Sequence, residues 1–173
     1  VSQNPQTFGV TGPGYFGGAL TLNTQSVCVL SKAAWTEKLE QCEVTIVNTA
    51  AAIGRLRDRG FSAYGTAKAA LTHLTRLMAA DLAPKVRVNA IAVGSVATSA
   101  LETVLTDDAV RGEMVSGTPL KRLGEPDDIA LCALYLASPA ASFVPSTIFD
   151  TAGWLDEANL HTCRPDLEAP SLW

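Results

Sequence analysis

An almost unbroken apolar run at residues 86–92 is the feature of this sequence that most constrains its fold. Such a run is typical of a parallel β-strand that other elements cover on both faces. A second strand-like segment lies upstream at residues 44–49, and a long helical pattern separates the two. Strands that alternate with helices indicate βαβ units. The expected fold class is therefore α/β with a parallel sheet.

The helical pattern between the two strands spans residues 62–82. Small and apolar side chains recur there at three- and four-residue spacing, at positions 63, 67, 70, 74, 77 and 78. Ser62 is the expected N-cap, and Pro84 prevents the helix from continuing. Tyr64 and Lys68 are four residues apart and share one helix face. An ammonium group beside a phenol is expected to lower the phenol pKa from its ordinary value of ~10, which makes Tyr64 a candidate general acid/base.

Taken alone, a tyrosine and a lysine at this spacing are more often two surface neighbours than a catalytic pair. Three further stretches accompany them: VTIVN at 44–48, VRVNAIAVG at 86–94 and PLKRLGEPDDIA at 119–130. In this order and at these intervals, YxxxK and its companions resemble the short-chain dehydrogenase/reductase family over roughly residues 20–156.

The resemblance implies a partial doubly wound, Rossmann-like parallel sheet, because the amino-terminal half that binds the cofactor in the family is largely missing from this sequence. The strand at 44–49 would then lack its inner neighbour, and the Ala-rich helices would pack against other subunits. Three parts are expected: a glycine-rich arm at 1–18, a truncated α/β domain at 19–156 and a tail at 157–173.

The resemblance also assigns catalytic roles. Tyr64 would be the general acid/base, and Lys68 would lower its pKa and contact the cofactor ribose. Asn23 would kink a helix at 19–39 and anchor a proton-relay water. The family's catalytic serine would stand thirteen residues before Tyr64, where this sequence has Ala51. Losing such a preorganised donor typically costs about 10²–10³ in rate, and Thr49 lies about 6–7 Å further back along the strand.

The expected cofactor by resemblance is NAD(P), or none in this chain. Lys68, Gly94, Val96 and Thr98 match the positions that contact it in the family, although Val93 replaces a proline there. The upstream stretch TGPGYFGG at 11–18 is similar to the family's phosphate-binding TGxxxGxG, but its middle glycine is Phe16. A flexible arm is the favoured interpretation of that stretch, since a lone glycine cluster is weak evidence.

Further elements are expected downstream. Residues 106–108 look like a helix start with acidic side chains, Pro126 begins a helix through Ala137, and residues 146–149 form the last strand. The family's closing D-G-G turn is represented here by Ala152, Gly153 and Trp154. If that turn requires a positive φ, a tryptophan would not adopt it easily.

Composition narrows the function classes. A net charge of −4 without a basic cluster argues against nucleic acid as a partner, and no apolar run is long enough to span a membrane. The four cysteines have no metal-binding spacing and are typical of reduced thiols in a cytoplasmic protein. The apolar content of 47% hints at buried oligomer surface.

Three functions are compatible with these observations. The first is an oxidoreductase for a small carbonyl or alcohol substrate, with Tyr64 as acid/base and a partner chain that completes the cofactor site. The second is a cofactor-independent descendant, a cyclase, isomerase or dehydratase, that uses Tyr64 for proton transfer. The third is a non-catalytic subunit (a pseudoenzyme) that stabilises a complete homologue in a homo- or hetero-oligomer.

Overall fold

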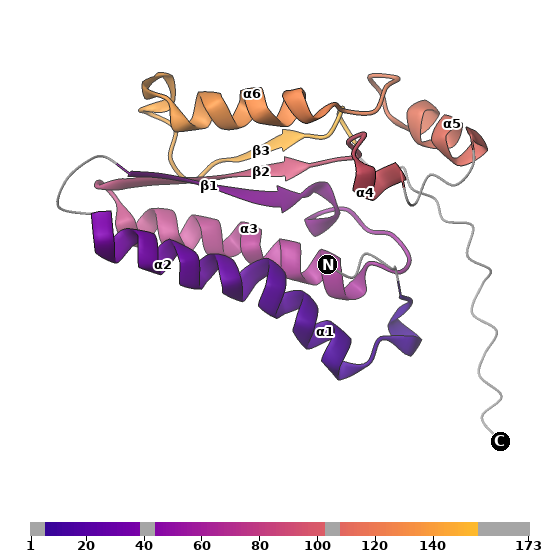
Figure 1. Ribbon diagram of the computed structural model, residues 1–173, viewed down its shortest axis with the longest axis horizontal. Coiled ribbons are helices and arrows are strands. Elements are labelled where there is room, and N and C mark those ends of the chain that lie inside the picture. Colours follow the sequence, from indigo (N-terminus) through magenta and orange to yellow (C-terminus); the bar gives the residue numbers. More distant parts are fainter. Residues whose placement is uncertain (1–5, 39–43, 103–107, 156–173) are drawn as a thin grey trace.

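The computed structural model describes residues 6–38, 44–102 and 108–155, and Figure 1 shows a sheet between two helical layers. The strands are β1 (Val44–Ala51), β2 (Val86–Val93) and β3 (Ile148–Thr151). They are parallel and lie in the order β1-β2-β3, with Val44 opposite Val86 and Ala90 opposite Ile148. This arrangement confirms the α/β fold class and the partial Rossmann-like sheet. Within the described residues, β1 is an edge strand.

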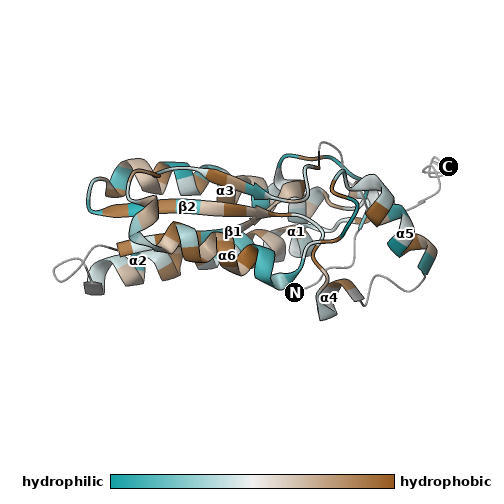
Figure 2. Ribbon diagram, turned by 90° about the horizontal axis from the view of Figure 1, so that it is seen from above, coloured by the Kyte–Doolittle hydropathy of each residue, from teal (hydrophilic) through white to brown (hydrophobic). Residues whose placement is uncertain are grey.

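The helices divide between the two faces of the sheet. Figure 1 shows α1 (Pro13–Leu20), α2 (Ser26–Lys38) and α3 (Ser62–Leu82) on one face and α6 (Pro126–Ala137) on the other. The short helices α4 (Ser99–Glu102) and α5 (Asp108–Gly117) lie beyond the carboxyl ends of the strands. Hydrophilic and hydrophobic residues alternate along α2, α3 and α6 (Figure 2), as expected for helices with one apolar face.

The bounds of α3 and α6 match the predicted helices at 62–82 and 126–137. The last strand begins two residues later than predicted, because Ser146 has a φ of 59° and turns the chain immediately before it. The first helix begins at Pro13 instead of Ala19, so part of the expected glycine-rich arm is helical. The predicted helix start at 106–107 and the tail at 157–173 lie outside the described residues.

The predicted N-cap of α3 was wrong, and the turn at Trp154 does require a positive φ. The N-cap of α3 is Phe61, and Ser62 is already helical; the Ser62 hydroxyl is buried and has no hydrogen-bond partner in the structure. Trp154 adopts a φ of 63°, directly after Gly153 at 65°. The chain turns sharply here because Ala152 and Leu155 on either side are buried in one apolar cluster, while the Trp154 side chain is 72% exposed.

The core lies on both sides of β2 and includes two buried asparagines. Asn48 Nδ2 donates to Thr75 Oγ1 over 2.9 Å and so ties β1 to α3. Asn89 donates to the Val144 carbonyl and accepts from the Thr147 N–H, which holds the turn before β3. Buried amides with both partners present join elements far apart in sequence. No helix in the described part of the chain is long and apolar enough to cross a membrane.

Candidate active site

Tyr64 and Lys68 lie on consecutive turns at the amino-terminal end of α3. The Lys68 ammonium is 5.7 Å from the centroid of the Tyr64 ring, which is cation–π range. Lys68 Nζ also donates to the Thr49 backbone carbonyl over 2.7 Å. The helix spacing therefore brings the pair together as predicted, and β1 holds the amine. Thr49 takes part through its backbone carbonyl.

Burial sets the pKa of both groups. Burial raises the pKa of the Tyr64 phenol above its ordinary value, and it lowers the pKa of the Lys68 ammonium. The prediction that Lys68 would lower the Tyr64 pKa is therefore wrong for this structure. The cost of removing a phenolate from water exceeds the attraction of the nearby amine. Tyr64 consequently stays a phenol at neutral pH, and burial makes it a weaker acid than an ordinary phenol.

The loop that follows β1 lies directly on α3. An added Cβ at Gly54 would come within 3.0 Å of the backbone of Lys68 and Ala69, and one at Gly65 within 3.2 Å of the Ile53 carbonyl. Glycine at both positions allows this close approach. The contact holds Ala51, the last residue of β1 and 9% exposed, near the amino-terminal turns of α3. The position predicted for the catalytic serine thus carries only a methyl group.

Asn23 lies in a π-helical turn, Thr21–Gln25, that joins α1 to α2. The Ser26 N–H donates to the Thr21 carbonyl, five residues back, and Asn23 Nδ2 donates to the Ala19 carbonyl over 2.9 Å. The next residue, Thr24, donates from Oγ1 to the Ala67 carbonyl of α3 over 2.8 Å. Sequence reasoning missed Thr24, because no local pattern reveals a partner 43 residues away.

The three loop positions predicted to contact a cofactor differ in their surroundings. Gly94 is required for packing, since a Cβ there would lie 2.6 Å from the Ala152 Cα. Val96 is buried and pairs with Gly124 in a short parallel bridge. Thr98 is exposed at the start of α4, where its hydroxyl accepts from the Leu101 N–H.

The donor set fits one end of NAD(P). The Lys68 amine and the exposed Thr98 hydroxyl are groups that hydrogen-bond ribose and carboxamide oxygens. The glycine cluster at 11–18 does not fit the pyrophosphate end. Most of it is the helix α1, no named strand precedes it within the described residues, and added Cβ atoms at Gly12, Gly14 and Gly17 would meet nothing within 4 Å.

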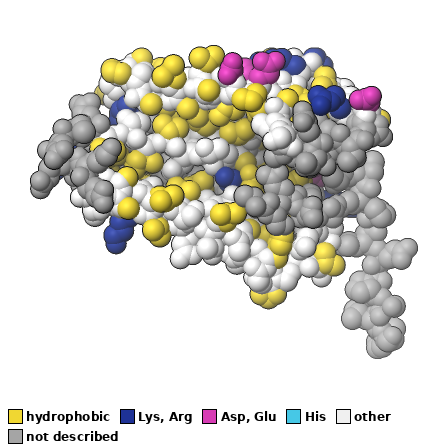
Figure 3. All heavy atoms as spheres, viewed as in Figure 1, with side chains coloured by type: hydrophobic (Ala, Val, Ile, Leu, Met, Phe, Trp, Pro, Cys, Tyr) yellow, Lys and Arg dark blue, Asp and Glu magenta, His cyan; other side chains and the backbone are white. Residues whose placement is uncertain are grey.

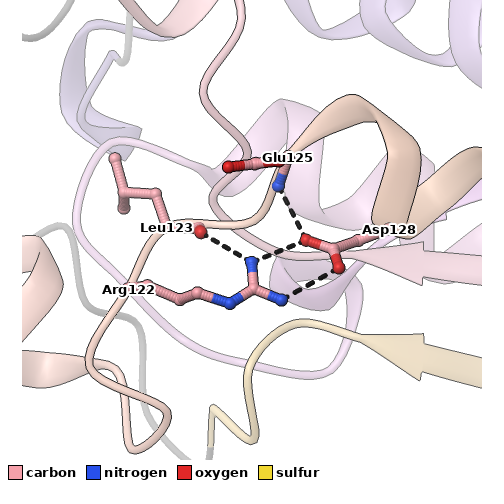
Figure 4. A network of polar contacts seen from close by, with 4 residues as sticks. All are labelled: Arg122, Leu123, Glu125 and Asp128. Atoms are coloured by element: carbon pink, nitrogen blue, oxygen red, sulfur yellow. Dashed lines mark hydrogen bonds and ion pairs between the residues drawn. The ribbon is translucent and has the colours of Figure 1, made fainter.

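A separate cavity of about 270 Å³ lies between the end of β3 and the start of α6, with Ser95, Thr118, Asp150 and Trp154 in its wall. None of the predicted catalytic residues lines it. Its wall also includes an ion pair: Arg122 donates to both carboxylate oxygens of Asp128 over 2.7 and 2.9 Å (Figure 4).

The Glu125 N–H also donates to Asp128 over 2.8 Å, which closes the amino-terminal cap of α6. The hydrogen bonds from Arg122 and from this N–H lower the pKa of Asp128 to about 2. This cluster therefore organises the start of α6, and the predicted catalytic residues do not line the cavity.

Comparison with known proteins agrees with this geometry. The family model described as enoyl-(acyl carrier protein) reductase matches residues 5–153. An uncharacterised oxidoreductase of Mycobacterium tuberculosis (strain CDC 1551 / Oshkosh) is 48% identical over 164 residues, which cover 94% of this chain and 62% of that protein. The 7α-hydroxysteroid dehydrogenase of Escherichia coli (strain K12) is 38% identical over 139 residues, covering 80% of this chain and 54% of that protein.

A solved structure of 7α-hydroxysteroid dehydrogenase, complexed with NADH and 7-oxo glycochenodeoxycholic acid, matches with a TM-score of 0.82 at 36% identity. The match covers 87% of this chain and 58% of that one. The chain thus spans about half to two thirds of the length of its curated relatives, 54% and 62% in the two cases given. The family-model match, the relatives and the shared fold together show that this chain belongs to the short-chain dehydrogenase/reductase family.

Proposed function

We propose that this chain supplies the proton-transfer side of an oxidoreductase site for a carbonyl or alcohol substrate. The observation that carries the proposal is the Tyr64–Lys68 pair at the start of α3, where the ammonium lies 5.7 Å from the centroid of the phenol ring. A phenol that stays protonated at neutral pH is a proton donor to the oxygen of a carbonyl under reduction. The opposite direction, alcohol oxidation, needs Tyr64 as the phenolate, which burial disfavours.

Each site residue has a role in this proposal. Tyr64 gives its hydroxyl proton to the substrate oxygen, and Lys68 holds positive charge beside the ring. Asn23 anchors the water through which the proton is replaced. When bound, NAD(P) supplies or accepts the hydride. Of its expected contacts, Lys68 and Thr98 are the polar side chains, while Gly94 and Val96 shape the loop between them.

The remainder of the cofactor site is proposed to come from a partner chain that carries an intact phosphate-binding loop. The edge position of β1 supports this, because an edge strand has a row of backbone groups available to another strand. A homo- or hetero-oligomer in the cytoplasm is part of the proposal. Figure 3 shows hydrophobic side chains on the surface over α6 and over the helices below the sheet. The exposed ones include Val29, Leu30, Leu77, Leu131 and Leu134.

The alanine at position 51 favours a second candidate. Without the serine hydroxyl, the oxyanion of a reduction is less stabilised, so the chain would be either a cofactor-independent enzyme that uses Tyr64 for proton transfer or a stabilising subunit of a complete homologue. Native mass spectrometry of the purified chain separates these cases. A hetero-oligomer with bound nicotinamide nucleotide supports the oxidoreductase or the stabilising subunit, and a nucleotide-free homo-oligomer supports the cofactor-independent enzyme.

Replacing the Tyr64 hydroxyl tests the proposed reaction directly. In the assembly in which the wild type turns over, NADH oxidation with 7-oxo glycochenodeoxycholic acid is followed by absorbance for Tyr64→Phe and for Tyr135→Phe. Tyr135 is a matched control, because its ring packs edge-on to Phe149 at the α6 face, away from the site. Tyr64→Phe should lose at least about 10²-fold in kcat, the lower end of what general acid–base catalysis contributes. Equal activity of the two variants would contradict the proposal.

A further inference from the structure

The π turn at Thr21–Gln25 interrupts what is otherwise one helical rod from Pro13 to Lys38. Such turns account for well under 1% of residues in globular proteins, and they occur frequently at functional sites. This turn carries Asn23, the residue expected to anchor the relay water. The position of the turn relative to α3 therefore sets where Asn23 lies relative to Lys68.

Thr24 connects the turn to α3 through a side-chain hydrogen bond. Its Oγ1 donates to the Ala67 carbonyl over 2.8 Å, and Ala67 is completely buried. The bond thus joins the residue after Asn23 to the residue before Lys68. The side chains of Thr21, Asn23, Ser26 and Thr36 make their recorded bonds within their own helical rod, whereas that of Thr24 crosses to the catalytic helix.

The Ala67 carbonyl can accept this hydrogen bond and still keep its place in the hydrogen-bond ladder of α3. A backbone carbonyl has two lone pairs, so Ala67 can accept the Thr24 hydroxyl in addition to the N–H of its own helix. The hydroxyl is only one torsion away from the backbone, so the bond restrains how far the two helices can slide along each other. The register matters because a one-residue slide moves Asn23 by about 1.5 Å along the rod.

We propose that Thr24 is a positioning residue that holds Asn23 in register with Tyr64 and Lys68 for proton relay. The inference rests on the proposed function, since the relay is needed only if Tyr64 exchanges protons with solvent. The clamp, by which we mean the hydrogen bond from Thr24 Oγ1 to the Ala67 carbonyl, is a property of the helices and is testable without turnover.

The experiment compares Thr24→Val, Thr24→Ser and Thr72→Val in the full chain. Thr72 is the matched control: its Oγ1 donates over 2.9 Å to the Lys68 carbonyl, but within α3, so its removal breaks no link between helices. Amide hydrogen exchange of residues 21–26 measures the clamp. Turnover at increasing imidazole concentration measures the relay, because a small external proton carrier replaces a displaced water path and does not repair a merely loosened fold.

Thr24→Val should exchange these amides about fivefold faster, as expected for the loss of one neutral hydrogen bond, whereas Thr72→Val should leave them unchanged. The kcat of Thr24→Val should fall about tenfold at constant KM and recover with imidazole. Thr24→Ser should behave as wild type. Exchange rates in Thr24→Val equal to those in Thr72→Val would overturn the clamp. A kcat loss insensitive to imidazole would overturn the relay role. A wild type without turnover would refute the proposed function, and the exchange data would still decide the clamp.

Discussion

Replacing Ala51 with serine asks whether a missing hydroxyl limits the proposed reaction. Ala51 ends β1 and is 9% exposed, so a hydroxyl there is largely withdrawn from water. One preorganised donor to a developing oxyanion is worth about 10²–10³ in rate, or about 2.7–4 kcal/mol. Ala51→Ser should therefore raise kcat/KM by that factor. Because the hydroxyl gives up its bond to water in the resting protein, the free energy of unfolding should fall by about 1 kcal/mol.

Ala50→Ser is the matched control for this prediction. Ala50 is 2% exposed, and alternation along β1 places its side chain on the opposite face. It receives the same hydroxyl and should lose at least as much stability without any gain in rate. The assay is NADH-dependent reduction of 7-oxo glycochenodeoxycholic acid, with urea unfolding in parallel. A gain for Ala51→Ser below about tenfold, or one equalled by Ala50→Ser, would refute the reasoning that position 51 faces the reacting oxygen.

Three further predictions concern stability and pH. Lys68→Met should abolish turnover and lower the free energy of unfolding by about 1 kcal/mol, since it removes the hydrogen bond from Lys68 Nζ to the Thr49 carbonyl; unchanged urea unfolding would contradict this. Trp154→Gly should stabilise by about 0.5–1 kcal/mol by relieving a φ of 63°, whereas Trp154→Ala should not. Asp128, whose pKa is lowered from 3.8 to about 2 by Arg122, adds stability above pH ~4 that is lost as the pH falls toward 2. Acid titration of Asp128→Asn should show a flatter loss over that interval than wild type.

The sequence by itself determined the elements that depend on neighbouring residues. The period of α3 and its bounds at Ser62 and Leu82 follow from apolar spacing and the proline at 84. The apolar run of β2 required helices on both faces of a parallel sheet. The YxxxK spacing placed Tyr64 and Lys68 together, because i and i+4 share a helix face in any α-helix. These features are local, so a linear pattern suffices to predict them.

Only the tertiary structure decided how the site behaves. The direction of the Tyr64 pKa depends on desolvation by segments distant in the chain, which spacing does not report. The bond from Thr24 to Ala67 joins residues 43 apart, and the positive φ of Trp154 arises because the flanking Ala152 and Leu155 enter the same cluster. Electrostatics and backbone strain are properties of what surrounds a residue. The sequence therefore identified the Tyr64–Lys68 pair, and packing determined the direction of its pKa shifts and its hydrogen-bond partners.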